Sequence, residues 1–381
     1  MASAQLKVLR DEDLRSRIGV VVGTRPGIVM FSPVIRELAR RSADFFVIHS
    51  GQHYSYNMDQ SFFDDLNLPD PDYKLDAVQS CTLHGEQTGE MLKGMERILL
   101  EERPRLVLVG GDANTNLSGA LAARKLRIGV GHIESGERSY DWRMPEEHNR
   151  VMIDHISDLL FVTNSKGSEA LARESVRGRI VESGNPIVDA AQQNLEIARE
   201  KSTILNTYGL EPKDYIVLTM HREENVDSLV NLTEALEGMR SVASKTGLEI
   251  QFLAHPRTLK RLKEFGLEET ASEIPGLQVR PGAGYLDFLS LQAHARLIMT
   301  DSGGVQQEAC ILKVPCVTLR ENTEWTETLD VGANMLAGTD PERMLAAAEK
   351  MLAATPDWGT PFGDGHSAET IVEESLRFVV A

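Results

Sequence analysis

The chain has 381 residues, of which 41% are hydrophobic, so it can bury a sizeable core and is longer than one doubly wound domain usually needs. Its formal charge of -17, from 57 acidic against 40 basic residues, disfavours nucleic acid and anionic membranes as partners, because both repel an acidic surface. We therefore expect two domains, no nucleic-acid partner and no membrane partner.

Cysteine usage and the N-terminal segment both favour the cytoplasm. Cys81, Cys310 and Cys316 are an odd number without C-x-x-C spacing, which predicts neither a disulfide framework nor a zinc site. Residues 1–17 mix charged side chains without an apolar stretch, which argues against a secretory signal, and no later apolar run is long enough to span a bilayer. We expect a cytoplasmic protein whose residues 1–17 form a loosely ordered arm.

The first half of the chain alternates predicted strands and helices. An apolar run at 18–22 ends in the turn Gly23-Thr24-Arg25-Pro26, and residues 34–39 follow with helical spacing, which makes one βα unit. The pattern continues as strand 45–48, helix 89–100, strand 106–109, helix 118–126, strand 129–133 and strand 179–181. Strands that alternate with helices predict a parallel sheet.

A second series of the same kind begins near Tyr215. In chain order it predicts strand 215–220, helix 229–243, strand 249–254, strand 296–300 and a helix that starts near residue 305. The turn-rich stretch Glu182-Ser183-Gly184-Asn185-Pro186 lies between the two series, so we place the domain junction there. Parallel sheets bind ligands at the carboxyl ends of their strands, where the polar clusters of this sequence lie.

One polar cluster, Asp301-Ser302-Gly303-Gly304, follows a predicted strand and precedes a predicted helix. Free backbone N–H groups at such a helix start suit a phosphate or pyrophosphate, and two glycines allow close approach. Glu308, about one turn further on, could accept hydrogen bonds from ribose hydroxyls. The same residues also fit a simple glycine turn.

Basic residues follow other predicted strands. Arg25 could hold phosphate oxygens bidentately, although a solvated arginine in a turn fits the tetrapeptide as well. His221 and Arg222 could contact a leaving diphosphate or relay protons, and His255-Pro256-Arg257 repeats the pattern one strand later. A surface origin for these pairs remains the simpler alternative.

Three acidic residues, Asp112, Glu134 and Glu146, are candidates for proton transfer, and we expect them to face one cleft. Carboxyl groups that lie close together or against a buried wall have raised pKa values and can act as acid and base near neutral pH. The alternatives are ordinary helix-start chemistry for Glu146 and Glu147 after Pro145, and a helix cap for Asp112.

Together these strings resemble those of one family, the UDP-N-acetylglucosamine 2-epimerases, which are similar to the two-domain glycosyltransferase fold GT-B. The matching strings are Gly23-Thr24-Arg25-Pro26, Gly51-Gln52-His53-Tyr54, Gly111-Asp112, His132-Ile133-Glu134-Ser135-Gly136, Pro145-Glu146-Glu147-His148-Asn149-Arg150, Ser183-Gly184-Asn185-Pro186, His221-Arg222-Glu223-Glu224-Asn225, Asp301 to Glu308, and Gly363-Asp364-Gly365. They span nearly the whole chain after Arg17, so the resemblance is specific even though each string alone is weak.

The resemblance implies an α/β fold of the GT-B-like class, with two Rossmann-like doubly wound domains that face each other across a cleft. We expect the acid and base residues in an N-terminal domain at 18–186 and UDP binding in a C-terminal domain at 187–366. Residues 367–381 are expected to form a helix that packs back on the first domain. Family members are usually dimers, so a homodimer is expected.

The resemblance also implies a reaction: reversible 2-epimerisation of UDP-N-acetylglucosamine to UDP-N-acetylmannosamine, through elimination of UDP to a 2-acetamidoglucal and re-addition. No metal and no cofactor is expected. Carried over residue by residue, the catalytic set is Asp112, Glu134, Glu146 and His221, and the substrate-binding set is Arg25, His221, Arg222, Phe288, Ser302, Gly303, Gly304 and Glu308.

Three departures from the family pattern bear on activity. Gly27 and Met30 stand where the family usually has Glu and Lys, which removes a cation from the diphosphate side. Residues 51–60 lack the Gln-His-Arg string of substrate-activated members, so that allosteric site is not carried over. Many relatives have Arg-Pro after Thr-Glu, whereas this chain has Trp325. The segment with Trp resembles the branches that act on diacetamido-uronic sugars.

Four alternatives to the non-hydrolysing epimerase stay open at this point. They are a hydrolysing 2-epimerase that releases N-acetylmannosamine and UDP, a 2-epimerase of another UDP-amino sugar such as a diacetamido-uronic acid, a GT-B glycosyltransferase, and an inactive UDP-sugar binder. The carboxyl groups favour proton transfer over glycosyl transfer and over mere binding.

Overall fold

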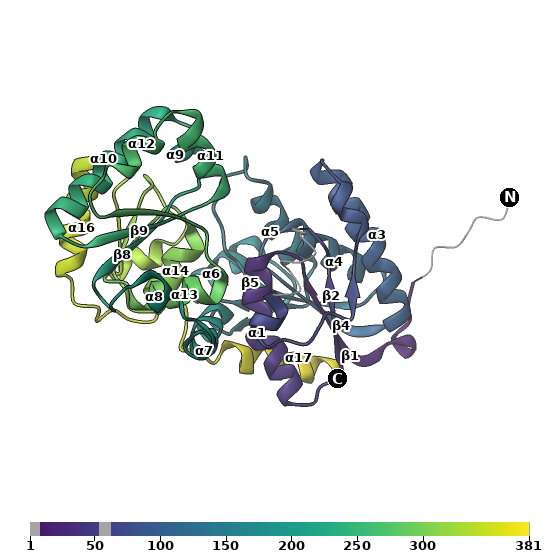
Figure 1. Cartoon of the computed structure of the whole chain (residues 1–381). Helices are drawn as coiled ribbons and strands as arrows, with labels where there is room; N and C mark the ends of the chain where they lie inside the picture. The colour runs from purple at the N-terminus through teal and green to yellow at the C-terminus, as the bar shows by residue number, and fades with distance from the viewer. Residues whose placement is uncertain (1–7, 53–61, 381) are drawn as a thin grey trace. The chain divides into compact units, whose positions relative to one another are not determined.

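The structure is a computed structural model that describes residues 8–52 and 62–380. The chain divides into two compact units, each built from alternating strands and helices (Figure 1). The first unit runs to Ala190 and resumes at Phe362, and the second spans Ala191–Pro361. The chain therefore leaves the first unit once and returns to it once.

The first unit is built on a parallel sheet of seven strands among the described residues, in the order β3-β2-β1-β4-β5-β6-β7. Its strands are β1 (Arg15–Val22), β2 (Phe45–His49), β3 (Tyr73–Lys74), β4 (Pro104–Gly110), β5 (Gly129–Ser135), β6 (Leu159–Val162) and β7 (Arg179–Glu182). Its helices are α1 (Arg25–Arg40), α3 (His84–Glu102), α4 (Asn114–Lys125), α5 (Pro145–Ile156), α6 (Ser165–Glu174), the start of α7 (Pro186–Lys201), and α17 (Ser367–Val380), with 3-10 turns η1 (Asp11–Asp13) and η2 (Ala77–Ser80).

The second unit repeats the plan with a parallel sheet of six strands in its described residues, in the order β10-β9-β8-β11-β12-β13. Its strands are β8 (Tyr215–Thr219), β9 (Glu249–Ala254), β10 (Leu277–Pro281), β11 (Leu297–Thr300), β12 (Cys316–Thr318) and β13 (Asn334–Leu336). Its helices are the rest of α7, α8 (Ile204–Tyr208), α9 (Glu223–Val226), α10 (Leu229–Thr246), α11 (Pro256–Glu264), α12 (Glu268–Ser272), α13 (Tyr285–His294), α14 (Gly303–Ile311), α15 (Thr326–Asp330) and α16 (Pro341–Ala353).

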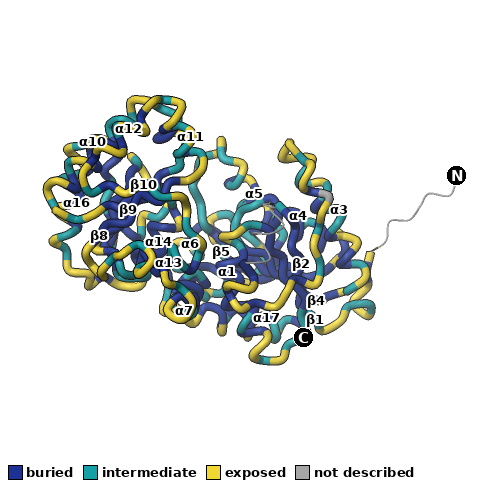
Figure 2. Tube along the Cα trace, in the orientation of Figure 1, coloured by how far each residue is buried: buried dark blue, intermediate teal, exposed yellow. Residues whose placement is uncertain are grey.

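The core of each unit lies along its central strands, which Figure 2 shows as buried. In β1, Ile18, Val20, Val21 and Val22 are all within 1% of full burial, as expected for a parallel strand that helices cover on both faces. Burial of each such side chain contributes about 1.5–3 kcal/mol to folding. In the second unit, α10 and α16 pack against each other and share a core with β8 and β9.

Both sheets have the Rossmann strand order, which confirms the predicted α/β fold class of two Rossmann-like, doubly wound domains. The longer predicted elements are also confirmed. Strands of two to five residues carry little periodicity: β2, β7, β8 and β11 were predicted, whereas β3, β6, β10, β12 and β13 were not.

The predicted arm is wrong for the part of it that the structure describes. Residues 1–7 lie outside the described residues, but β1 already begins at Arg15, three residues earlier than expected. The N–H of Arg15 donates to the carbonyl of Arg103 at 2.8 Å, and Arg17 forms an ion pair with Glu102. The arginines at 15 and 17 concealed this strand start, although Arg17 packs over the ring of Phe46 while its charge pairs with Glu102.

The helix predicted at 89–100 packs within its own unit. Met91, Met95 and Leu99 on α3 are fully buried in the cluster that includes β1 and β4. Separately, none of the helices in the described part of the chain combines the length and the hydropathy that a bilayer span requires.

Strand order reverses once in each sheet, between β1 and β4 in the first unit and between β8 and β11 in the second. Ligands of open α/β sheets bind outside the carboxyl ends of the strands at such a switch point, because the loops diverge there. Most of the predicted site residues follow these four strands or their neighbours.

Candidate active site

The switch point of the first unit begins with Gly23, a glycine that two neighbouring side chains approach closely. A Cβ on Gly23, directly after β1, would lie 1.8 Å from Oγ of Ser50 and 2.5 Å from Oγ1 of Thr115. The next residue, Thr24, caps α1 by accepting a hydrogen bond from the N–H of Gly27 at 3.2 Å. This turn places Arg25 at the first position of α1, exposed and without a side-chain partner among the described residues.

Asp112 follows β4 on the other side of the switch point, and its carboxylate forms an ion pair with Arg150. Its backbone carbonyl accepts a hydrogen bond from Nδ2 of Asn149 at 2.8 Å. The helix-cap alternative does not hold, because Ala113 occupies the N-cap position of α4 and no side chain caps it. Asp112 is therefore held by α5, through side chain and backbone together.

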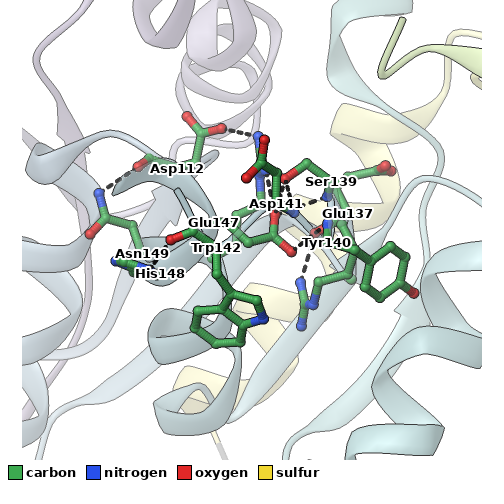
Figure 3. Close-up of polar contacts among 12 residues, drawn as sticks. Asp112, Glu137, Ser139, Tyr140, Asp141, Trp142, Glu147, His148 and Asn149 are labelled. Carbon is green, nitrogen blue, oxygen red and sulfur yellow. Dashed lines mark hydrogen bonds and ion pairs between the residues drawn. The ribbon is translucent and has the colours of Figure 1, made fainter. Parts of the chain in front are cut away.

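Glu147 organises the start of α5 and the loop before it (Figure 3). It is 2% exposed, and its carboxylate accepts from the N–H of Ser139 at 2.9 Å, the hydroxyl of Ser139 at 2.8 Å and the N–H of Tyr140 at 3.0 Å. Arg150 donates to the same carboxylate at 2.8 Å. Although burial alone would raise the pKa of Glu147, these donors lower it. Arg150 thus forms ion pairs with both Glu147 and Asp112 and links the two carboxylates.

Glu134 lies at a bulge in β5, where the register to β6 shifts and its own φ is +65°. A left-handed conformation at a non-glycine residue is costly and is typical of functional sites. Its Oε1 accepts a hydrogen bond from Nδ2 of Asn185 at 2.6 Å. Burial raises the pKa of Glu134, and the neighbouring Asp112 adds to the rise against the opposing hydrogen bond from Asn185.

The structure brings two of the three predicted acids together. Asp112 and Glu134 are close enough for the charge of Asp112 to raise the pKa of Glu134, since Asp112 follows β4 and Glu134 lies near the end of the adjacent strand β5. Glu146, the second residue of α5, is partly exposed and makes no side-chain hydrogen bond or ion pair with any described residue. Its carboxylate remains available at the helix start.

The fully buried His132 helps to fix the positions of the two acids. Nδ1 of His132 lies 2.7 Å from Oδ1 of Asp154, and Nε2 lies 3.0 Å from the carbonyl of Gly111. Both partners offer acceptor oxygens, so the ring is held between the Asp154 carboxylate and the Gly111 carbonyl. Although burial alone would raise the pKa of Asp154, His132 and Arg138 lower it. His132 therefore ties β5 to the backbone that precedes Asp112.

In the second unit, one buried carboxylate joins the two strands at the switch point. Asp301, after β11, accepts from the backbone N–H groups of His221 at 2.9 Å and Arg222 at 2.8 Å, which both follow β8. It also accepts from Nδ2 of Asn225 at 3.1 Å and lies 3.0 Å from Nδ1 of His221. The predicted residues His221 and Arg222 are thus held next to the predicted glycine loop.

The glycine loop begins α14, with Ser302 as N-cap residue and no side chain on the first N–H groups. A Cβ on Gly303 would lie 2.4 Å from Oε1 of Glu324 and 2.9 Å from Nε1 of Trp325, whereas a Cβ on Gly304 would meet nothing within 4 Å. The N–H groups of Gly303 and Gly304 can donate to phosphate oxygens, as a helix N-terminus does, whereas the N–H of Ser302 donates to Oγ1 of Thr300 at 3.0 Å.

Glu308, in the second turn of α14, is 8% exposed and lies in the interior of the second unit. Its Oε2 accepts from Nε2 of Gln292 at 2.6 Å. Burial raises the pKa of Glu308 to about 7, against the hydrogen bonds from Gln292 and Tyr285. Phe288, on α13 with Gln292, packs on the cluster beneath β11 rather than standing free.

The remaining sequence predictions concern metal binding, the cysteines and the string at 51–54. Among the described residues, no group of three or more His, Cys, Asp or Glu side chains is arranged to hold a metal. All three cysteines are free thiols. His53 and Tyr54 of the Gly51-Gln52-His53-Tyr54 string lie outside the described residues, while Oε1 of Gln52 accepts from Thr115 at the start of α4.

Reasoning from the sequence missed the residues that hold the acids in place. Glu147, Arg150 and Asp154 recur at three- and four-residue intervals, which puts them on one face of α5, and this spacing of polar residues could have identified them. Asn185 gave no such signal, because it lies in a turn and reaches Glu134 only through the fold.

Comparison with known proteins gives one consistent result. Residues 36–375 match the family model described as UDP-N-acetylglucosamine 2-epimerase. A UDP-N-acetylglucosamine 2-epimerase of Methanococcus maripaludis is 49% identical over 359 residues, which cover 93% of this chain and 97% of that protein. A UDP-2,3-diacetamido-2,3-dideoxy-D-glucuronate 2-epimerase of Pseudomonas aeruginosa is 36% identical over 94% of this chain and 98% of that protein.

A solved structure agrees with the sequence relatives. The crystal structure of the Methanocaldococcus jannaschii UDP-GlcNAc 2-epimerase in complex with UDP-GlcNAc and UDP has 48% sequence identity and a TM-score of 0.83. The match covers 94% of this chain and 99% of that one.

Proposed function

This chain belongs to the UDP-N-acetylglucosamine 2-epimerase family, and from that membership we propose that it interconverts UDP-N-acetylglucosamine and UDP-N-acetylmannosamine. It is an isomerase in this proposal. The observation that carries it is the pair Asp112 and Glu134, two carboxyl groups on adjacent strands in opposite electrostatic surroundings. Inversion at carbon 2 needs one group to remove a proton and another to supply one.

The surroundings of the two acids favour different protonation states. Asp112 is paired with Arg150, an arrangement that stabilises a carboxylate, so it would be the group that accepts the proton. Glu134 is surrounded by protein atoms and has a raised pKa, so it would carry the proton that is delivered. Pairs of titratable groups whose surroundings separate their pKa values are the usual basis of acid and base roles.

Bond changes in the proposed reaction balance without a redox partner. The base takes the carbon 2 proton, the carbon 1 to oxygen bond breaks, and UDP leaves behind a 2-acetamidoglucal. UDP then adds back to carbon 1 while a proton reaches the opposite face of carbon 2. Glu146, whose carboxylate is unpaired among the described residues, is the further candidate for handling these protons.

The second unit would hold the UDP part. Backbone N–H groups of Gly303 and Gly304, after the N-cap residue Ser302, would donate to diphosphate oxygens, and Glu308 would accept from ribose hydroxyls. Positive charge from His221 and Arg222 would stabilise the departing diphosphate, which matters most in the transition state. Arg25 in the first unit is an exposed cation suited to the same task, and Phe288 is proposed near the uracil.

The choice of sugar follows the relatives. Relatives named UDP-N-acetylglucosamine 2-epimerase reach 48% and 49% identity, against 36% for the diacetamido-glucuronate enzyme. This favours the N-acetylglucosamine nucleotide despite Trp325. Hydrolysis would need only that water, rather than UDP, add to the glycal, and no described residue distinguishes the two outcomes.

One experiment separates these functions. The purified protein would be incubated with UDP-N-acetylglucosamine in deuterium oxide while NMR follows the anomeric and carbon 2 protons. We expect deuterium at carbon 2 and a manno UDP-sugar that accumulates to equilibrium. Free N-acetylmannosamine with UDP would indicate hydrolysis, and absence of exchange with this nucleotide but not with the diacetamido-uronic one would reassign the substrate.

The setting of the enzyme is part of the proposal. We propose that it acts in the cytoplasm as a homodimer, which the family resemblance supports. Light scattering coupled to size exclusion would give twice the mass of the 42.2 kDa chain for a dimer.

A further inference from the structure

Asp301 is fully buried, and every group around its carboxylate is a donor. Two backbone N–H groups, those of His221 and Arg222, and the side-chain amide of Asn225 lie within 3.1 Å of Oδ2. Although burial alone would raise the pKa of Asp301, the hydrogen bonds and the charge of His221 lower it. An ionised carboxylate accepts from all these donors, whereas a neutral acid or an amide would oppose one of them.

The fourth contact of this carboxylate fixes the chemistry of the histidine ring. Nδ1 of His221 lies 3.0 Å from Oδ1 of Asp301. Because a carboxylate can only accept, Nδ1 must carry a proton, which leaves Nε2 as the ring nitrogen open to a substrate. Nε2 has no partner among the described residues, and the side chain is 39% exposed.

A neighbouring histidine is locked in the opposite way. The ring centroids of His221 and His255 are 5.9 Å apart. Nδ1 of His255 accepts from the N–H of Arg257 at 3.2 Å, because His255 is the N-cap residue of α11. An accepting Nδ1 has no proton, so His255 is a neutral ring with its proton on Nε2. His221 and His255, which follow the adjacent strands β8 and β9, therefore differ in whether the ring nitrogen that faces the protein, Nδ1, carries a proton.

We propose that Asp301 is a positioning residue of the epimerase reaction, which holds a proton on Nδ1 of His221 and so stabilises the imidazolium form, whose Nε2–H would donate to the departing diphosphate. The assignment rests on the proposed function only for the identity of the ligand. The tautomer itself follows from hydrogen bonds within the second unit. Asp301 acts through His221 and does not itself touch the substrate.

Asp301 therefore affects two parts of the proposed diphosphate site, the glycine loop and His221. Asp301 directly precedes the loop at Ser302 and Gly303, which would hold the phosphates, and its side chain sets the orientation of His221 after β8. Any shift of the loop would move the carboxylate and with it the histidine. Preorganisation of this kind stabilises developing charge without reorganisation during the reaction.

The first test uses the unmodified full-length chain with 15N-labelled histidine. The chain has ten histidines, and the spectrum of a His221→Gln variant identifies the two signals of His221 by their loss. We expect a protonated Nδ1 and, above the pH at which the ring becomes neutral, an unprotonated Nε2. A proton on Nε2 with a bare Nδ1 would overturn the proposal, whatever the activity.

The second test separates positioning from folding. Asp301→Asn should lower kcat on the order of 100-fold with KM little changed, because an orienting carboxylate acts on the transition state. In a His221→Gln background the same change should cost almost nothing more, since both residues act as one unit. Equal losses in both backgrounds would mean that Asp301 only supports the fold, and the proposal would fail.

A matched control is Asp227→Asn. Asp227 is also a carboxylate of the second unit with several donors, but it accepts from the side chains of Arg257 and Arg261 instead of from His221. It should leave kcat and the His221 signals unchanged. If the wild-type protein converts no UDP-amino sugar yet shows the Nδ1 proton, the proposed function fails while the assignment of the tautomer stands.

Discussion

Met30 and Glu134 approach Gly111 from the same side. A Cβ on Gly111 would lie 3.4 Å from Oε2 of Glu134 and 3.7 Å from Cε of Met30. Met30 is 8% exposed, and burial is the main cause of the raised pKa of Glu134. The departure at position 30 thus lies beside a proposed proton donor.

Met30→Lys should place a cation next to Glu134 and lower its pKa, because a nearby positive charge favours the carboxylate. If Glu134 delivers its proton in the reaction, activity on the alkaline side of the pH profile should be lost at a lower pH than in the wild type. The measurement is kcat/KM for UDP-N-acetylglucosamine against pH. Met30→Leu, which keeps the site apolar, should leave the profile in place; an unchanged profile in Met30→Lys would contradict the role of Glu134.

Arg150→Met should separate Asp112 from Glu147. Asp112 loses its ion pair and Glu147 loses one of four donors, so we expect a loss of activity on the order of 100-fold and a cost of about 1–3 kcal/mol in stability. Steady-state kinetics and thermal unfolding give the two numbers. Glu147→Gln should share the stability cost with a smaller loss of activity, and the opposite ranking would show that Glu147 matters more to the chemistry.

Uridine should bind more weakly as the pH falls through about 7. Below that pH Glu308 is protonated and loses acceptor capacity for ribose hydroxyls, whereas above it the carboxylate is complete. Affinity should fall by up to about tenfold per pH unit on the acid side. Calorimetry with uridine avoids the titration of a phosphate. Glu308→Gln should bind weakly at every pH, and a sloping profile in that variant would rule out Glu308 as the titrating group.

Gly303→Ala and Gly304→Ala should differ in stability although they are adjacent in α14. The first introduces a Cβ 2.4 Å from Oε1 of Glu324, and the second introduces one into open space. We expect Gly303→Ala to lower the melting temperature and Gly304→Ala to hold or raise it, since alanine favours a helix by about 0.5–1 kcal/mol over glycine. Equal melting temperatures would show that Glu324 and Trp325 move away without cost.

Sequence patterns were sufficient for the plan of the fold. Buried parallel strands such as 18–22 and 106–109 are continuous apolar runs, and the glycines that follow them, Gly23 and Gly110, mark their carboxyl ends. The short edge strands and the true start of β1 at Arg15 could not be predicted, because pairing with a neighbour defines them and composition does not.

Only those residues of the candidate site that stand at strand ends could be predicted from the sequence. Asp112, Glu134 and Asp301 stand at strand ends, a position that the order of elements reveals. The roles of Asn185, Glu147 and His132 depend on distances between segments far apart in the chain, such as the 2.6 Å contact from Asn185 to Glu134. Hydrogen-bond partners of that kind leave no local signal in a single sequence.

The C-terminal helix α17 sets the order in which the protein can be completed during synthesis. It packs on α1 and β1 of the first unit, where it buries Ile371, Val372 and Val379, while the ring of Phe378 covers Gly129 of β5. These side chains contribute several kcal/mol, a large part of the stability of an average domain. A nascent chain that has reached residue 361 already holds the whole second unit but lacks this part of the first. The unit that is translated first is therefore finished last.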